Sequence, residues 1–223
     1  MKNSKDWTGN KKSIWSALAA NNHSEAEREI NDFYATDPKA LELFLDKINE
    51  DGIELHDYIW ECACGTGNLS KTLEKRGYNV FSTDLVSRGF GIGGVDFLKC
   101  PNLIYFIKDS ELNGIKVREN LPISEVDILT NPLYKHALDF VKHSLDILED
   151  GYYAIFFLKI QFLEGKARKI FFENYPPKYV YVHSERQKCA INNDFSKVNS
   201  SAVCYCWFIW QKGYKGEPII RWI

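Results

Sequence analysis

Residues 56–85 decide the fold, and they read HDYIWECACGTGNLSKTLEKRGYNVFSTDL. The apolar segment 56–63 predicts a short strand, and it leads into the glycine turn CGTGN at 64–68. Residues 69–77 predict a helix, and 78–85 predict a second strand. A strand, a glycine turn, a helix and a second strand form one βαβ unit, so the sequence predicts a parallel sheet.

The same alternation continues along the chain. Further strands are predicted at 125–131, 152–160, 178–184 and 201–213, and helices at 38–48, 134–151 and 165–175. The strands 178–184 and 201–213 have no clear helix between them, so they are expected to pair antiparallel. We therefore predict an α/β fold: a doubly wound, Rossmann-like sheet, mostly parallel with an antiparallel edge hairpin, and helices on both faces. Residues 31–223 are expected to form this single domain, and residues 1–30 an N-terminal arm.

Composition narrows the class of protein. The chain has 223 residues, of which 45% are apolar, so it can bury a core and disorder is not favoured. No apolar run is long enough for a membrane span, and the first residues lack a secretory signal, so a cytoplasmic location is expected. The six cysteines are expected to be reduced. Two pairs have C-x-C spacing, unlike the C-x-x-C of common zinc sites, so no metal site is expected.

Charge is distributed unevenly. The chain has a net charge of −2, yet residues 151–223 contain 11 Lys and Arg against 5 Asp and Glu. This basic C-terminal third permits a local phosphate-binding face on a chain that is otherwise acidic. An ordinary solvated surface explains the same charges equally well.

The glycine turn carries the first candidate site. Gly65 and Gly67 have no Cβ, so a ligand can approach the backbone there, and Asp84 at the end of the next strand suits two ribose hydroxyls. Ser70 stands where the dinucleotide fingerprint has its third glycine, which disfavours NAD. Glu61 fits a cationic sulfonium and amino-acid group better than a pyrophosphate. A purely structural glycine turn is the alternative.

The second candidate site is Asn131-Pro132-Leu133-Tyr134, at the carboxyl end of a predicted strand. It resembles the Asn/Asp/Ser-Pro-Pro-aromatic signature of amino-methyltransferases, with Leu133 in place of the second proline. An aromatic amine is a poor nucleophile because its lone pair is delocalised. The Asn131 side-chain oxygen and the Pro132 carbonyl can each accept one amino hydrogen and so direct that lone pair at a methyl group. Tyr134 is then expected to stack on a base that has left its helix.

Taken together, the motifs resemble small phage- and prophage-type DNA adenine methyltransferases of bacteria. DFYATDP, ECACGTG, STDL, GVDF, TNPLY, FLKIQFLEGKARKIFF, PPKYVYV, CWFIW and KGYKGEPIIRWI occur in the order expected for that family. The resemblance implies S-adenosylmethionine as cofactor and transfer of its methyl group to the 6-amino group of adenine. In the family, the segment that corresponds to 31–38 covers the methionine end of the cofactor, and a carboxylate at the position of Asp96 lies near its adenine.

The resemblance also implies the site residues. The expected catalytic residues are Asn131, Pro132 and Tyr134. The expected cofactor-binding residues are Tyr34, Thr36, Pro38, Glu61, Cys64, Gly65, Gly67, Asp84, Leu85, Asp96, Phe97 and Asn131.

The expected partner is nucleic acid, with double-stranded DNA first and single-stranded DNA or RNA as alternatives. The topology puts a set of polar and basic residues near the same sheet edge, where they are candidates for phosphate or base contacts. They are Lys159, Gln161, Lys166, Arg168, Lys169, Arg186 and Lys188. The long polar segment 186–201 is predicted to be a loop. Two other classes stay open: a methyltransferase acting on RNA or on a protein glutamine, and a non-catalytic regulator that binds S-adenosylmethionine.

Overall fold

A computed structural model describes residues 34–100, 126–191 and 203–223. Its main feature is a seven-stranded sheet with the strand order β3-β2-β4-β5-β8-β6-β9. The strands are β2 (Tyr58–Glu61), β3 (Asn79–Ser82), β4 (Asp127–Thr130), β5 (Tyr153–Lys159), β6 (Tyr179–Val182), β8 (Tyr205–Gln211) and β9 (Ile219–Trp222). Strands β3, β2, β4 and β5 are parallel, β8 runs antiparallel to β5 and β6, and β9 is parallel to β6. This mixed, Rossmann-like sheet confirms the predicted fold class.

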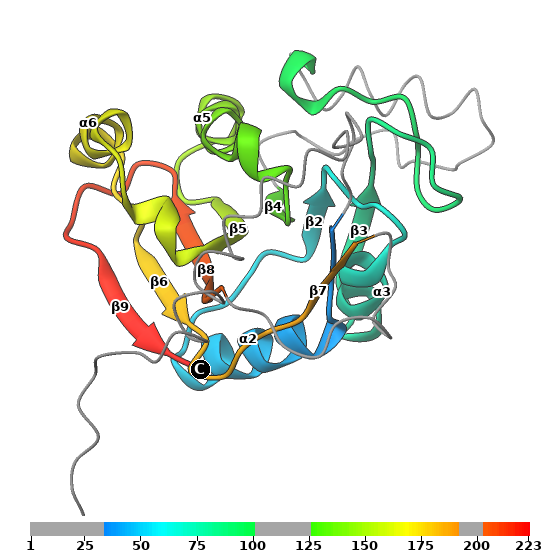
Figure 1. The fold of residues 1–223 in the computed structure, drawn as a ribbon, viewed down its shortest axis with the longest axis horizontal. Coiled ribbons are helices and arrows are strands. Elements are labelled where there is room, and N and C mark those ends of the chain that lie inside the picture. Colours follow the sequence, from blue (N-terminus) through cyan, green and yellow to red (C-terminus); the bar gives the residue numbers. More distant parts are fainter. Residues whose placement is uncertain (1–33, 101–125, 192–202) are drawn as a thin grey trace, which may run out of the picture.

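Helices cover both faces of the sheet, as predicted (Figure 1). The α-helices are α2 (Pro38–Glu50), α3 (Asn68–Lys75), α5 (Ala137–Ile147) and α6 (Lys166–Asn174). The short 3₁₀ turns are η1 (Phe97–Lys99), η3 (Tyr134–His136) and η4 (Ile160–Leu163). Helices α5 and α6 pack on one face, while α2 and α3 pack on the other. Because alternate residues of a strand point to opposite faces, β5 and β8 contribute to both cores.

Strand β8 lies inside the sheet, between β5 and β6, and β9 occupies the edge beyond β6. It pairs with β6 along Tyr179↔Ile209 to Val182↔Cys206, which confirms the predicted antiparallel pair. Its other side pairs with β5 over seven residues. The sequence did not predict β9, which adds to β6 and forms the outer edge of the sheet in Figure 1.

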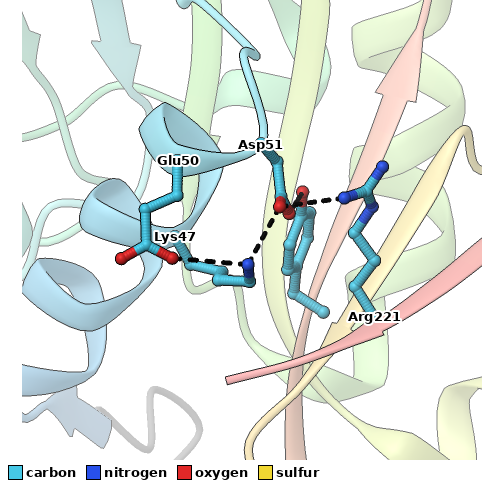
Figure 2. Close-up of polar contacts among 5 residues, drawn as sticks. Lys47, Glu50, Asp51 and Arg221 are labelled. Atoms are coloured by element: carbon cyan, nitrogen blue, oxygen red, sulfur yellow. Dashed lines mark hydrogen bonds and ion pairs between the residues drawn. The ribbon is translucent and has the colours of Figure 1, made fainter.

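A cluster of polar contacts attaches β9 to helix α2. Asp51, directly after α2, accepts hydrogen bonds from the Tyr181 hydroxyl at 2.7 Å and from Lys47 at 2.9 Å. Arg221 of β9 completes the cluster with an ion pair to Asp51 at 2.9 Å (Figure 2). The Asp51 side chain is only 8% exposed. Its buried charge is balanced by two cations, Lys47 and Arg221. The cluster therefore stabilises the C-terminal strand against the body of the domain.

A second polar cluster joins the amino ends of the central strands. Asp127, at the start of β4, is fully buried and accepts three hydrogen bonds. They come from the Tyr153 backbone at 2.8 Å, and from the His56 backbone and ring, both at 2.9 Å. The bond to Asp127 raises the pKa of His56 above its ordinary value. This cluster lies at the end of the sheet opposite to the candidate site.

A small second sheet was not predicted. Strand β1 (Tyr34–Thr36) pairs antiparallel with β7 (Cys189–Ile191), with Thr36 opposite Cys189. Strand β7 thus occupies part of the segment 186–201 that was predicted to be a loop. The predicted helix 134–151 is instead the turn η3 followed by α5. The proposed N-terminal arm, residues 1–30, lies outside the described residues.

No helix among the described residues is long and apolar enough to cross a membrane.

Candidate functional site

A pocket opens at the carboxyl ends of β2 and β4, the edge at which open α/β sheets bind ligands. It has about 220 Å³ of empty space, part of which is open to solvent. Its lining residues are Ala35, Thr36, Glu61, Ala63, Cys64, Asn68, Leu69 and Asn131. The structure therefore brings together four of the predicted cofactor residues, from three segments far apart in the sequence: Thr36, Glu61, Cys64 and Asn131.

Glu61 supplies the carboxylate of the pocket. It ends β2 and is 2% exposed, and its Oε2 accepts hydrogen bonds from the Ser70 backbone at 2.8 Å and from the Ser70 hydroxyl. The Ser70 hydroxyl also contacts that of Ser82 at 2.6 Å. Burial raises the pKa of Glu61 to about 8, and the negative charges of Asp84 and Glu74 act in the same direction, although the bonds from Ser70 oppose it. The side chain is therefore mostly protonated at neutral pH.

Asp84 holds the glycine turn against the end of β3. One carboxylate oxygen accepts the Gly65 N–H at 2.8 Å, and the other accepts the Val86 N–H at 2.8 Å. A carboxylate oxygen has two lone pairs, so each can accept a further hydrogen bond, for example from a ribose hydroxyl. Asp84 thus orders the glycine turn.

Gly67 is required by the protein's own packing. It has a φ of +81°, and a Cβ at this position would lie 2.4 Å from the ring of Phe90. Another residue here would strain the backbone and would require the Phe90 side chain to shift. Lys71, one turn further along α3, holds its ammonium 4.7 Å from the centre of the same ring.

Asn131 is fixed from the small sheet. Its amide nitrogen donates to the Thr36 hydroxyl at 2.9 Å, and the Thr36 carbonyl accepts from the Asn68 amide at 3.3 Å. The Asn131 nitrogen is thereby used within the protein, and the oxygen is the atom of this amide that can accept an amine hydrogen. Thr36 therefore links the start of α3 to the end of β4.

Leu133 occupies the position of the second proline without distorting the turn. Its φ is −54° and its ψ is 119°, within the range that a proline adopts. Pro132 before it is buried. The departure from the family signature therefore leaves the backbone of the tetrapeptide in a proline-compatible conformation.

Tyr134 lies beside Asn131 with its hydroxyl directed into the protein. The hydroxyl donates to the Cys189 sulfur at 3.9 Å, and the Tyr205 ring centre is 6.2 Å from that of Tyr134. Burial raises the pKa of Tyr134 well above its ordinary value. The Lys159 ammonium lies over the ring, 4.7 Å from its centre. Sequence reasoning missed Cys189 and Tyr205, because one lies in a predicted loop and the other reads as an ordinary buried strand residue.

Several predicted cofactor residues do not line the pocket. Asp96 forms an ion pair with Lys99 at 2.8 Å, and Phe97 is a core residue that packs against Trp60 with ring centres 5.0 Å apart. Asp84, which bonds the glycine turn, is also outside the lining, as are Leu85, Pro38, Gly65, Gly67 and Tyr34. Leu85 is 52% exposed, Pro38 is the exposed first residue of α2, Gly65 and Gly67 are in the turn, and the Tyr34 backbone pairs with Ile191.

The candidate nucleic-acid residues fall into two groups. Lys188 lies near the pocket, since its carbonyl accepts the Asp37 N–H at 3.2 Å, next to Thr36. In the same group, Lys159 lies over the Tyr134 ring, and Arg186 is exposed two residues before Lys188. The second group follows β5: Gln161 and Lys166 are exposed, while Arg168 and Lys169 are engaged within the protein. Arg168 donates to the carbonyls of Glu164 and Gln161, and Lys169 is paired with Glu173.

In the described ranges, no group of three or more His, Cys, Asp or Glu side chains is placed to hold a metal ion.

Comparison with known proteins establishes the fold. No protein-family model and no curated protein matches the sequence. A protein from Pyrococcus horikoshii, described provisionally as an RNA methyltransferase, is similar in structure with a TM-score of 0.50 and 14% identity, over 92% of this chain and 98% of that one. The type IIG restriction endonuclease BpuSI is similar with a TM-score of 0.52 and 16% identity, over 85% of this chain and 26% of that one.

A protein from Streptococcus thermophilus, described provisionally as a hemolysin, has a TM-score of 0.50 and 10% identity, over 79% of this chain and 66% of that one. This chain thus spans less than two thirds of that protein and about a quarter of the endonuclease. At such identities the similarity defines a Rossmann-like fold that is also used by methyltransferases, and it leaves chemistry to the residues of the site.

Proposed function

We propose that this protein is an S-adenosylmethionine-dependent methyltransferase that acts on the 6-amino group of adenine in nucleic acid, with DNA as the first candidate substrate. The observation that carries the proposal is the meeting of Asn131 and Glu61 in one pocket, with Asn131 oriented by Thr36. The two residues come from the ends of two different strands. The Asn131 amide can accept a hydrogen bond from the acceptor amine, and Glu61 can pair with a cationic group of the cofactor.

The residues of the pocket fit the methionine end of S-adenosylmethionine. Glu61 provides a carboxylate for a cationic group, and Asn68 and Thr36 provide hydrogen-bonding groups. Ala35, Ala63 and Leu69 supply apolar contact. Asp84 would accept the ribose hydroxyls, in addition to the backbone N–H groups that it already binds. When bound, this cofactor supplies an electrophilic methyl group.

The contribution of the protein is to position the acceptor amine. The Asn131 oxygen and the Pro132 carbonyl can each accept one amino hydrogen, which directs the nitrogen lone pair toward the pocket. In the orientation that bonds Thr36, the Asn131 amide uses its nitrogen within the protein and leaves its oxygen to accept from the amine. Tyr134 provides an aromatic surface for the base. No covalent enzyme intermediate is required.

The choice of adenine in DNA rests on the resemblance of the ordered motifs to phage-type adenine methyltransferases. The Pyrococcus protein of similar structure is described as an RNA methyltransferase, so the kind of nucleic acid is part of the test. RNA, a protein glutamine and a non-catalytic regulatory role are the competing outcomes.

The experiment is transfer of radioactive methyl from S-adenosylmethionine to unmodified DNA, RNA and protein, followed by identification of the methylated group. We expect N6-methyladenine in DNA. Asn131→Ala should reduce transfer at least about 100-fold and change cofactor affinity far less, because its main action is on the acceptor although it also lines the pocket. Asn174→Ala, on the exposed end of α6, is the matched control and should keep full activity. Methylation of another group, or an unaffected Asn131 variant, would contradict the proposal.

A further inference from the structure

Lys159 stands out in strand β5. The six preceding residues of the strand, 153–158, are buried and apolar or aromatic, whereas Lys159 is half-buried and charged. Its backbone position is set by pairing with Tyr205 of β8, in a register that continues over the whole strand. The lysine is therefore anchored at the carboxyl edge of the sheet, the edge where the pocket opens.

The ammonium of Lys159 is held at the surface on which an acceptor base would stack. Its Nζ lies 4.7 Å from the centre of the Tyr134 ring, a distance typical of a cation–π contact. The Tyr134 ring cannot easily turn away, because its hydroxyl is buried against Cys189. Burial raises the pKa of Cys189, and the charge of Lys159 opposes this rise.

A nucleotide stacked on Tyr134 brings its own phosphate close to this ammonium. The phosphate and base of one nucleotide are joined through a single sugar, and the lysine side chain has four flexible carbons over which to reach it. A phosphate attracts a lysine ammonium more strongly than an aromatic ring does, because the phosphate carries a full charge.

We propose that Lys159 binds a phosphate that flanks the target base, so that the acceptor site selects a nucleotide within a strand over a free base or nucleoside. The ammonium moves from the face of Tyr134 to the phosphate as the base enters. Lys159 thus determines substrate class at the acceptor site itself, separately from basic residues on the outer surface. This inference rests on the proposed function.

The test removes the charge of Lys159 and the charge of the flanking phosphate, first separately and then together. After the methylated adenine has been located, duplexes are made with a neutral methylphosphonate directly 5′ or directly 3′ of it. Catalytic efficiency, kcat/KM, is measured for wild type, Lys159→Gln and Lys159→Arg on the natural and the neutral duplexes. Lys75→Gln, at the exposed last residue of α3 and outside the candidate nucleic-acid residues, is the matched control.

We expect Lys159→Gln to lose about tenfold to a hundredfold on natural DNA and Lys159→Arg to retain most of the efficiency. On the duplex that lacks the contacted phosphate, wild type and Lys159→Gln should be nearly equal, because the interaction is already absent. Equal losses on natural and on both neutral duplexes would overturn the inference and leave Lys159 as a support for Tyr134. Wild-type protein that methylates no nucleic acid would overturn the proposed function, and this inference with it.

Discussion

Binding of S-adenosylmethionine should release a proton from Glu61. This side chain is buried in the pocket and bonded to Ser70, and burial raises its pKa to about 8. A cationic ligand beside it favours the carboxylate, so its pKa falls on binding. The two charged neighbours named above, Asp84 and Glu74, both oppose ionisation, so the protein without ligand keeps the proton at neutral pH.

The magnitude follows from the pKa. With a pKa of about 8, about one molecule in a hundred has an ionised Glu61 at pH 6, and about one in eleven at pH 7. If the ligand binds the ionised form, its Kd should fall about ninefold between these pH values, with about 0.9 proton released per ligand at pH 7. The amino group of the ligand titrates near the ordinary α-amino pKa of about 7.7–8.0, so its charge is nearly constant over this range.

Isothermal titration calorimetry in two buffers with different ionisation enthalpies measures both quantities. Glu61→Gln keeps an acceptor for the Ser70 N–H, so it should fold, and it should bind with no proton release and no pH dependence. Glu149→Gln, at an exposed position after α5 and not among the charges that shift the pKa of Glu61, is the control and should retain the proton release. A wild-type Kd that is equal at pH 6 and pH 7, with no proton exchanged, would refute the reasoning.

Two further predictions concern stability. Gly67→Ala should destabilise the protein by about 1–3 kcal/mol in urea unfolding, through backbone strain and the contact with Phe90. Gly77→Ala is the control, because Gly77 has a φ of +93° and an added Cβ would meet nothing within 4 Å, so this variant has the backbone strain alone. If Gly77→Ala lost as much unfolding free energy as Gly67→Ala, the contact with Phe90 would contribute nothing. The bond to Asp127 raises the pKa of His56, so its stabilisation is complete below about pH 6.5 and is lost as pH rises through the raised pKa. The melting temperature of His56→Gln should accordingly depend less on pH between 6 and 8 than that of wild type, and identical profiles would contradict this.

Most of the fold could be predicted because hydrophobic periodicity is local. Each strand of the parallel part and each α-helix of the described residues has a run of apolar residues that shows its period within a dozen residues. Strand β7 could not be recognised in this way, because its three residues stand in a polar segment and pair with β1 from the other end of the chain. Strand β9 was missed for a related reason: it is short and exposed at Ile219, Ile220 and Trp222.

The site was predictable where a residue type is tied to a backbone feature. Glu61 ends one strand and Asn131 directly follows another, and the carboxyl ends of neighbouring parallel strands meet at one edge. Thr36 was predicted as a site residue only from the family resemblance. The structure gives a physical reason for its place there, because its hydroxyl accepts a hydrogen bond from the Asn131 amide. Phe97 shows the limit of such reasoning, since an apolar residue beside a turn is equally suited to the core, and it packs there.

The structure distinguishes two pairs of basic residues that the sequence treats as equal candidates for phosphate contacts. The sequence makes Arg168 and Lys169 as good candidates for phosphate contacts as Arg186 and Lys188. In the structure, the first pair is engaged: the Arg168 guanidinium bonds two backbone carbonyls, and Lys169 is paired with Glu173. The second pair is exposed and directly precedes Cys189, which contacts Tyr134.

We therefore expect the second pair to carry more of the salt dependence of DNA binding. Each phosphate contact contributes about −0.9 to the slope of log K against log salt, because it releases condensed counterions. Arg186→Ala with Lys188→Ala should make the slope less steep by up to about 2, and Arg168→Ala with Lys169→Ala should change it less, since breaking their internal contacts offsets any gain from phosphate. Cofactor affinity is measured in parallel and should stay constant in both double variants. A larger change in the α6 variant would place the DNA backbone across α6, whereas two unchanged slopes would place it on a surface that neither pair reaches.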